Sequence, residues 1–177
     1  MIRTMNTITT LIHHSGPFFE MTTEPKLVAF TQFYGVLNVP SRMWMIRDWA
    51  RRIGYHLVGL PQCIFHPGGD GPEHPFCEVE WEVEEAATED GGDVALRWSD
   101  GCRIIVGLHI GESSAVEETT SALKAWGEAM GYCPNGTRRE IYHLDLRGSA
   151  GEPVTEVQLV VEGASTGRGH NSPGEMS

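Results

Sequence analysis

The sequence lacks the usual marks of a secreted, membrane-spanning or metal-binding protein. No apolar run in its 177 residues approaches the ~20 residues that a membrane helix needs. Residues 1–16 lack the apolar core and cleavage site of a signal peptide. Cysteine is scarce, and the four present form no C-x-x-C pair and no zinc spacing: Cys63, Cys77, Cys102 and Cys133. We therefore expect a cytoplasmic protein with reduced cysteines and with neither a metal nor another cofactor.

Positive charge is scarce as well. The formal net charge is −11, from 13 Lys and Arg against 24 Asp and Glu. Nucleic-acid binding needs a basic footprint, so we expect no nucleic-acid partner. The acidity mildly favours cationic ligands, but the simpler interpretation is that it keeps the protein in solution.

The composition divides the chain into one domain and two terminal segments. Residues 1–16 are expected to form a flexible arm, and the Gly/Ser-rich residues 163–177 a disordered tail. Between them, the acidic segment 85–93 is the predicted linker between residues 17–84 and residues 94–162.

The domain contains an internal repeat. Residues 47–66 align with residues 124–143 at a constant offset of 77, and six of 20 positions are identical. The identical pairs are Trp49/Trp126, Gly54/Gly131, Tyr55/Tyr132, Gly59/Gly136, Ile64/Ile141 and His66/His143. Two copies are too few for a solenoid, so we expect a pseudo-twofold pair of halves with a ligand cleft where they meet.

Each copy predicts a strand, a helix, a short strand and a last strand. The strands are β-branched and apolar or alternate in polarity, and each helix carries one apolar face. The predicted strands are 27–33, 63–66 and 77–83 in the first copy and 102–109, 140–143 and 155–161 in the second. Segments 15–21 and 93–98 are candidates for a leading strand in each half. The expected fold is α+β, two β-α-β-β repeats with the helices on one face of the sheet.

Strand alternation separates the side chains of the short strands into two sets. The repeated Ile64 and Ile141 are expected to face the helices. The other set would then face away from the helices, into the cleft: Cys63, Phe65, Glu140 and Tyr142.

The remaining aromatic and acidic side chains are divided in the same way. Trp49, Trp126 and Trp81 fall on apolar faces, which favours core packing over a ligand clamp. Trp44 and Trp98 lie off these faces and are candidates for the cleft rim. Glu78, Glu80 and Glu82 alternate with apolar residues, and they either draw a cation or, as favoured here, face water.

Four segments of the second copy together resemble GyrI-like domains, which are also found as effector-binding domains of multidrug-responsive regulators. They are HIGESSA (109–115), ALKAWGEAMGY (122–132), REIYHLDLR (139–147) and EPVTEVQLVV (152–161). The resemblance covers residues 17–162 and not the DNA-binding segment of those regulators. It implies a cup between two β-α-β-β halves for bulky, aromatic and often cationic molecules.

The resemblance implies specific roles. The family's buried glutamate maps to Glu140 and its tyrosine neighbour to Tyr142, and we predict both as catalytic, with Glu140 as a general base. Phe65 and Cys63 are predicted cup walls, and Tyr34, Trp44 and Trp98 further ligand contacts. The H/R-x-G-x-Y pattern of the family is incomplete here, because 109–113 read HIGES and only Gln32–Gly35 remain of it in the first copy. Two alternatives stay open: Glu140 paired with Arg138 or Arg139, and Tyr142 as a core residue.

Three functions follow from the resemblance. A subset of stand-alone members hydrolyses the strained cyclopropane ring of DNA-alkylating natural products, and we favour this self-protective activity on a hydrophobic aromatic molecule. The second function is a module that sequesters or senses a drug without chemistry. The third is modulation of DNA gyrase through protein contacts, which we regard as less favoured. No membrane partner is expected.

Overall fold

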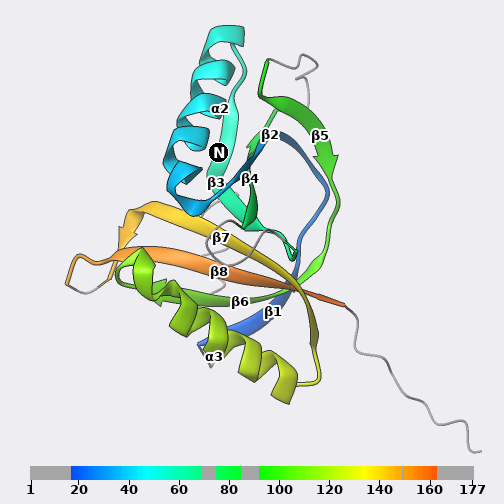
Figure 1. Ribbon diagram of the computed structural model, residues 1–177, viewed down its shortest axis with the longest axis vertical. Coiled ribbons are helices and arrows are strands. Elements are labelled where there is room, and N and C mark those ends of the chain that lie inside the picture. The colour runs from blue at the N-terminus through cyan, green and yellow to red at the C-terminus, as the bar shows by residue number, and fades with distance from the viewer. Residues whose placement is uncertain (1–16, 69–74, 85–91, 149, 163–177) are drawn as a thin grey trace, which may run out of the picture.

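The computed structural model describes residues 17–68, 75–84, 92–148 and 150–162 (Figure 1). The predicted arm 1–16, the tail 163–177 and most of the linker lie outside these residues. Eight strands and two α-helices follow one another in the order β1 Phe18–Thr22, β2 Lys26–Tyr34, α2 Val39–Ile53, β3 Leu57–Phe65, β4 Phe76–Val83, β5 Ala95–Ser99, β6 Arg103–Ile110, α3 Val116–Ala129, β7 Cys133–Arg147 and β8 Pro153–Glu162. A turn of 3-10 helix precedes each α-helix, at Val36–Asn38 and at Ser113–Ala115.

All eight strands form one antiparallel sheet in the order β1-β6-β8-β7-β3-β4-β2-β5. The order is symmetric about the β7–β3 seam, since each half continues with its last strand, its first strand and one edge strand. The edge strands are exchanged, because β1 pairs with β6 of the second half and β5 with β2 of the first. The α+β class is confirmed; that the halves superpose as a pseudo-twofold pair around one central cleft stays a prediction.

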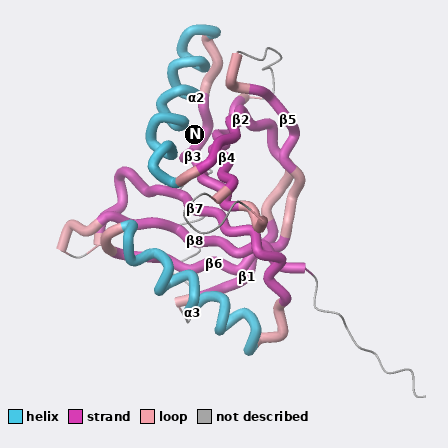
Figure 2. Tube along the Cα trace, viewed as in Figure 1, coloured by secondary structure: helices cyan, strands magenta, loops and turns pink. Residues whose placement is uncertain are grey.

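The two helices cover different halves of the same sheet face. In Figures 1 and 2, α2 lies against the half with β2, β3 and β4, and α3 lies against the half with β6, β7 and β8. Helix α2 begins with Pro40 in its first turn, and it ends at Gly54, which has a left-handed conformation with φ of 91°. Its residue Trp49 is fully buried, as predicted.

The core under the helices consists of two clusters. Under α2, Ile46, Trp49 and Ala50 pack with Cys63 and Val79 of the sheet. Under α3, the main members are Leu123, Val116, Ile105, Val157 and Leu159, with Trp126 packed against them. No helix in the described part of the chain is long and apolar enough to cross a membrane.

The predicted orientation of the short strands was wrong. Cys63 belongs to the cluster under α2, and Phe65 and Tyr142 pack against that cluster. The face with Cys63, Phe65, Glu140 and Tyr142 therefore points toward the helices. The face with Ile64 and Ile141 points away from them. Both faces of this strand pair carry buried apolar side chains, so the repeated isoleucines could not distinguish the two sides.

Candidate functional site

Glu140 lies at the seam between the two halves of the sheet. Its strand, β7, places it opposite Cys63 of β3 on one side and opposite Val157 of β8 on the other. Glu140 is only 5% exposed. A buried carboxylate is costly unless neighbours compensate it, so its partners decide what it does.

Two side chains of the same strand partner Glu140. The Tyr142 hydroxyl donates a hydrogen bond to Oε2 at 2.7 Å, and Arg138 Nε lies 3.2 Å from Oε1. Among the described residues the Nε–H has no hydrogen-bond acceptor, so Arg138 acts on Glu140 as a nearby charge. Burial, and then the negative charge of Glu140, raise the pKa of Tyr142 above its usual range, so Tyr142 remains a neutral donor.

Arg138 also connects this pair to α3. Its Nη1 donates to Oε2 of Glu117 at 2.6 Å, and its guanidinium carbon lies 4.3 Å from the centre of the Phe65 ring. The ring face attracts the cation. A positive charge therefore already lies beside Glu140, between two carboxylates and over an aromatic ring.

A cavity of about 300 Å³ adjoins Arg138. Its lining comes from α3 and from the ends of β3, β7 and β8: Phe65, His66, Glu117, Thr120, Lys124, Pro134, Gly136, Arg138 and Leu159. Glu140 is not part of the lining, but Phe65 and Arg138 are, and Arg138 lies next to Glu140. The volume is at the lower end for a drug-sized ligand site.

Cys63 is fully buried in the cluster under α2 and lines neither cavity, so its predicted place in the cup wall stays a prediction. A hydrogen bond with Cys77, and then burial, raise the pKa of the Cys63 thiol above its usual range. The same hydrogen bond lowers the pKa of Cys77. All four cysteines of the chain are free thiols.

Three predicted ligand contacts are not part of the buried group. Tyr34, Trp44 and Trp98 are each exposed over more than half of their surface. The ring of Tyr34 contacts Phe76, with centroids 5.4 Å apart, and Trp44 lies under the guanidinium of Arg47. Their role in ligand binding stays a prediction.

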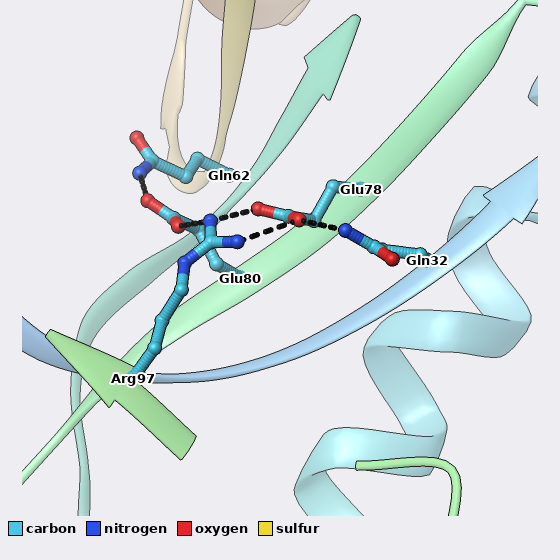
Figure 3. A network of polar contacts seen from close by, with 5 residues as sticks. All are labelled: Gln32, Gln62, Glu78, Glu80 and Arg97. Atoms are coloured by element: carbon cyan, nitrogen blue, oxygen red, sulfur yellow. Dashed lines mark hydrogen bonds and ion pairs between the residues drawn. The ribbon is translucent and has the colours of Figure 1, made fainter. Parts of the chain in front are cut away.

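The expectation that Glu78 and Glu80 face water was wrong. Both are 0% exposed and point away from the helices into a polar network with Arg97 of β5 (Figure 3). Arg97 donates from Nη1 to Glu78 Oε2 at 2.8 Å and from Nη2 to Glu80 Oε2 at 2.9 Å, and it also contacts Glu78 Oε1. Gln32 donates to Glu78 at 3.0 Å, and Gln62 donates to Glu80 (Figure 3). The chain folds this way because β5 crosses to pair with β2 and brings its arginine over β4.

Sequence reasoning missed the cavity residues Glu117 and His66 and underrated Arg138. The sequence left Arg138 and Arg139 both open as partners of Glu140, and the structure places Arg138, two residues away on the same face of the strand, beside it. His66 is identical to His143 in the repeat, and its Nε2 is buried without a partner among the described residues. Nothing in the sequence indicated that Glu117 of α3 would reach Arg138.

No family model and no curated protein match the sequence. Solved structures do share its fold. The C-terminal domain of EcmrR has a TM-score of 0.66 and 16% identity, with 82% of this chain and 96% of that domain covered. A hydrolase from Listeria innocua has a TM-score of 0.68 and 12% identity, with 89% and 97% covered. An uncharacterized conserved protein from the same organism has a TM-score of 0.69 and 13% identity, with 89% and 98% covered.

At these identities the likeness shows the fold. It agrees with the fold implied by the resemblance to GyrI-like domains, which is confirmed in this respect. In an EcmrR–DNA complex, the matched part is 63% of the longer EcmrR chain.

Proposed function

We propose that the protein binds a flat, hydrophobic aromatic molecule in the cavity beside α3 and hydrolyses a strained, electrophilic ring of that molecule. The observation that carries the proposal is the buried Glu140–Tyr142 pair, joined at 2.7 Å, behind a cavity walled by Phe65 and Arg138. Fold similarity to a protein called a hydrolase supports the proposal as an analogy of architecture.

The chemistry assigned to the pair is general-base catalysis. Glu140 accepts a proton from water, and the water oxygen forms a bond to a carbon of a cyclopropane conjugated to a carbonyl group. The ring C–C bond breaks, its electron pair moves into the carbonyl, and a proton from solvent completes the product. Tyr142, whose raised pKa keeps it protonated, holds the carboxylate oxygen in place.

Arg138 changes the expected charge of the ligand. A carboxylate at the base of an aromatic cup favours a cation, but here Arg138 lies 3.2 Å from Glu140 and over Phe65. A cationic ligand would have to displace this guanidinium or bind beside it. We therefore expect neutral aromatic molecules to bind better than cationic ones of the same shape.

The test is turnover by less than one equivalent of protein. The purified protein is incubated with a tenfold excess of a cyclopropane-bearing, DNA-alkylating compound, and intact and ring-opened compound are separated by chromatography. Conversion beyond one equivalent, with water added to the ring, supports hydrolysis. Consumption that stops at one equivalent with release of unchanged compound on denaturation would refute it.

The ion pair between Arg138 and Glu140 favours a second candidate, a binding protein without chemistry. A compensated carboxylate is suited to holding a shape as well as to accepting a proton. In that case the same experiment shows at most one equivalent of compound bound and none converted. Glu140→Gln would then change only the affinity for the compound.

A further inference from the structure

A second and larger cavity, of about 510 Å³, lies on the opposite side of the sheet. Its floor is formed by side chains of β3, β7 and β8 that point away from the helices, including Gln62, Arg139, Ile141 and Gln158. The turns at 22–26 and 99–100 form its wall. Thr23 of the first turn donates its N–H to the carbonyl of Cys102, two residues beyond the second, at 2.9 Å. The proposed hydrolytic site plays no part in this cavity.

Arg139 supplies this cavity with a positive charge that has no ion-pair partner among the described residues. It is adjacent to Arg138 in the sequence and on the other face of β7. Its Nε is buried and has no acceptor in the described part of the chain. The residue opposite it, Gln158, is 4% exposed and has a buried Oε1 without a partner as well.

In the other half of the sheet, the side chain at the equivalent position has its hydrogen-bond partner. Gln62 is paired in register with Glu80, as Arg139 is with Gln158. In the first half the amide donates to the carboxylate, and Arg97 completes the network. In the second half the pair is a guanidinium and an amide, so the missing member is an anion.

The other charged groups of the cavity have partners or lie at its edge. Glu156 accepts from Gln158 at 2.6 Å and is 3.3 Å from His143 Nε2. Glu82 is 3.9 Å from Lys26. Glu24 and Asp100 belong to the wall turns and are exposed to solvent.

Apolar side chains line the same cavity as the guanidinium. Ile141 is two residues from Arg139 on the same face of β7, and Val58 and Leu60 of β3 line the same space, with Met21 of β1 on the far side. A ligand that satisfies Arg139 therefore also needs a hydrocarbon part.

We propose that this cavity binds a small amphipathic carboxylate, with the carboxylate on Arg139 and the hydrocarbon part against Ile141 and Leu60. Arginine recognises carboxylates through two parallel N–H···O bonds, which gives this ligand class its preference over neutral analogues. The site is independent of Glu140, so it stands or fails separately from the proposed hydrolysis.

The test compares 2-naphthoate with its neutral analogue 2-naphthamide by isothermal titration calorimetry. We expect saturable binding of naphthoate to the full chain and weaker binding of naphthamide. Arg139→Gln should weaken naphthoate binding by about 10- to 100-fold, the range for hydrogen bonds to charged groups, and leave naphthamide unchanged. Arg139→Lys, which keeps the charge and loses the paired geometry, should give an intermediate loss.

Arg51→Gln, which removes an exposed arginine of α2 that lines neither cavity, is the control, and it should leave naphthoate binding unchanged. Backbone amide shifts on titration should move at 58–62 and 139–141. Absence of saturable naphthoate binding, equal binding of the two probes, or an unchanged naphthoate affinity in Arg139→Gln would each overturn the proposal. Circular dichroism of each variant verifies that the fold is intact.

Discussion

On the face of the sheet away from the helices, β4 carries Glu78 and Glu80, whereas β8 carries Glu156 and Gln158 at the corresponding places. Glu78 and Glu80 share one arginine, Arg97 of the edge strand β5. At the matching place on the edge strand β1 the residue is Met21, because Met21 pairs with Ile104 as Arg97 pairs with Val28. Glu156 of β8 contacts His143 and Gln158 instead.

The order of the strands therefore does not decide which buried charges are paired. Both halves use the same order of strands, yet one half closes its buried charges internally and the other leaves the guanidinium of Arg139 open to a cavity. Removing one member of a buried charge cluster leaves its partner charge uncompensated and destabilises the fold. The proposed carboxylate site rests on this guanidinium, whose buried Nε has no acceptor among the described residues.

The largest effect is expected at the seam, where Glu140 of one half is opposite Cys63 of the other. Glu140→Gln keeps the shape and loses the base, so turnover should fall by about 10²–10⁴-fold in the assay above. Cys63→Ser, at the partner position, should retain most of the turnover. A Glu140→Gln protein with undiminished turnover would remove Glu140 from the chemistry.

The next largest effect concerns the first half's closed network. Arg97→Met copies the residue of the other half and leaves Glu78 and Glu80 buried without a cation. Because Arg97 is itself about a third exposed, we expect a loss near the lower end for broken buried pairs, about 3 kcal/mol in urea denaturation.

Adding Glu80→Gln copies the second half further and removes one of the two orphaned charges. We expect this double variant to recover about 1 kcal/mol relative to Arg97→Met. If Arg97→Met has the same free energy of unfolding as the natural protein, the network of Figure 3 does not contribute to stability as expected.

A smaller effect is expected from removing Arg138, the arginine that is paired with carboxylates on the helix face of the sheet. Arg138→Gln removes the charge that lies 3.2 Å from Glu140, and the carboxylate should then favour an external cation. We expect affinity for a planar cationic dye to rise by about tenfold, with a neutral dye of the same shape little changed. Fluorescence titration measures both. Equal or weaker binding of the cation in the variant would contradict the role of Arg138.

The smallest effect is expected at the edge of the second half. Tyr132 donates to Glu20 at 2.6 Å, and this bond, followed by Arg103, lowers the pKa of the Glu20 carboxyl. The lowered pKa stabilises the fold above the ordinary glutamate value of about 4.3, and the gain is lost as pH falls through the folded-state value.

In Tyr132→Phe the pKa of Glu20 should therefore rise toward the ordinary value, and stability at pH 7 should fall by less than about 1 kcal/mol, since the pair is partly exposed. A carbon-detected NMR titration of the glutamate side chains follows the pKa directly. Tyr55→Phe, the matched variant of the first half, should leave the pKa of Glu20 unchanged. A shift in Tyr55→Phe and none in Tyr132→Phe would show that another group controls Glu20.

Much of the architecture was predictable because it depends on local patterns. Apolar periodicity indicated the helices and the strands, and the repeat predicted that their order would occur twice. Strand length was underestimated, since β7 runs over Cys133–Arg147 where only 140–143 were expected. Exposed, polar ends of long strands carry little periodic signal.

The sequence predicted which residues would lie together better than it predicted which side of the sheet they would face. The resemblance to GyrI-like domains pointed to Glu140 and Tyr142, and the structure brings these two together with Phe65 and Cys63. Whether they act on a ligand stays a prediction. The orientation was wrong because β3 and β7 are the central strands of the sheet, where both faces are covered and alternation loses its meaning.

The amino-acid sequence by itself determined the element types, their repeated order and the residues that a catalytic or binding role could use, because these depend on near neighbours along the chain. Only the tertiary structure decided which buried charges have an ion-pair partner and which have none. Arg97 reaches Glu78 and Glu80 because β5 crosses to the edge of the first half, while Met21 occupies the matching place in the second. The partners of buried charges come from strands that are distant in the sequence. For this reason no local pattern could predict that Arg139 would lack a carboxylate partner.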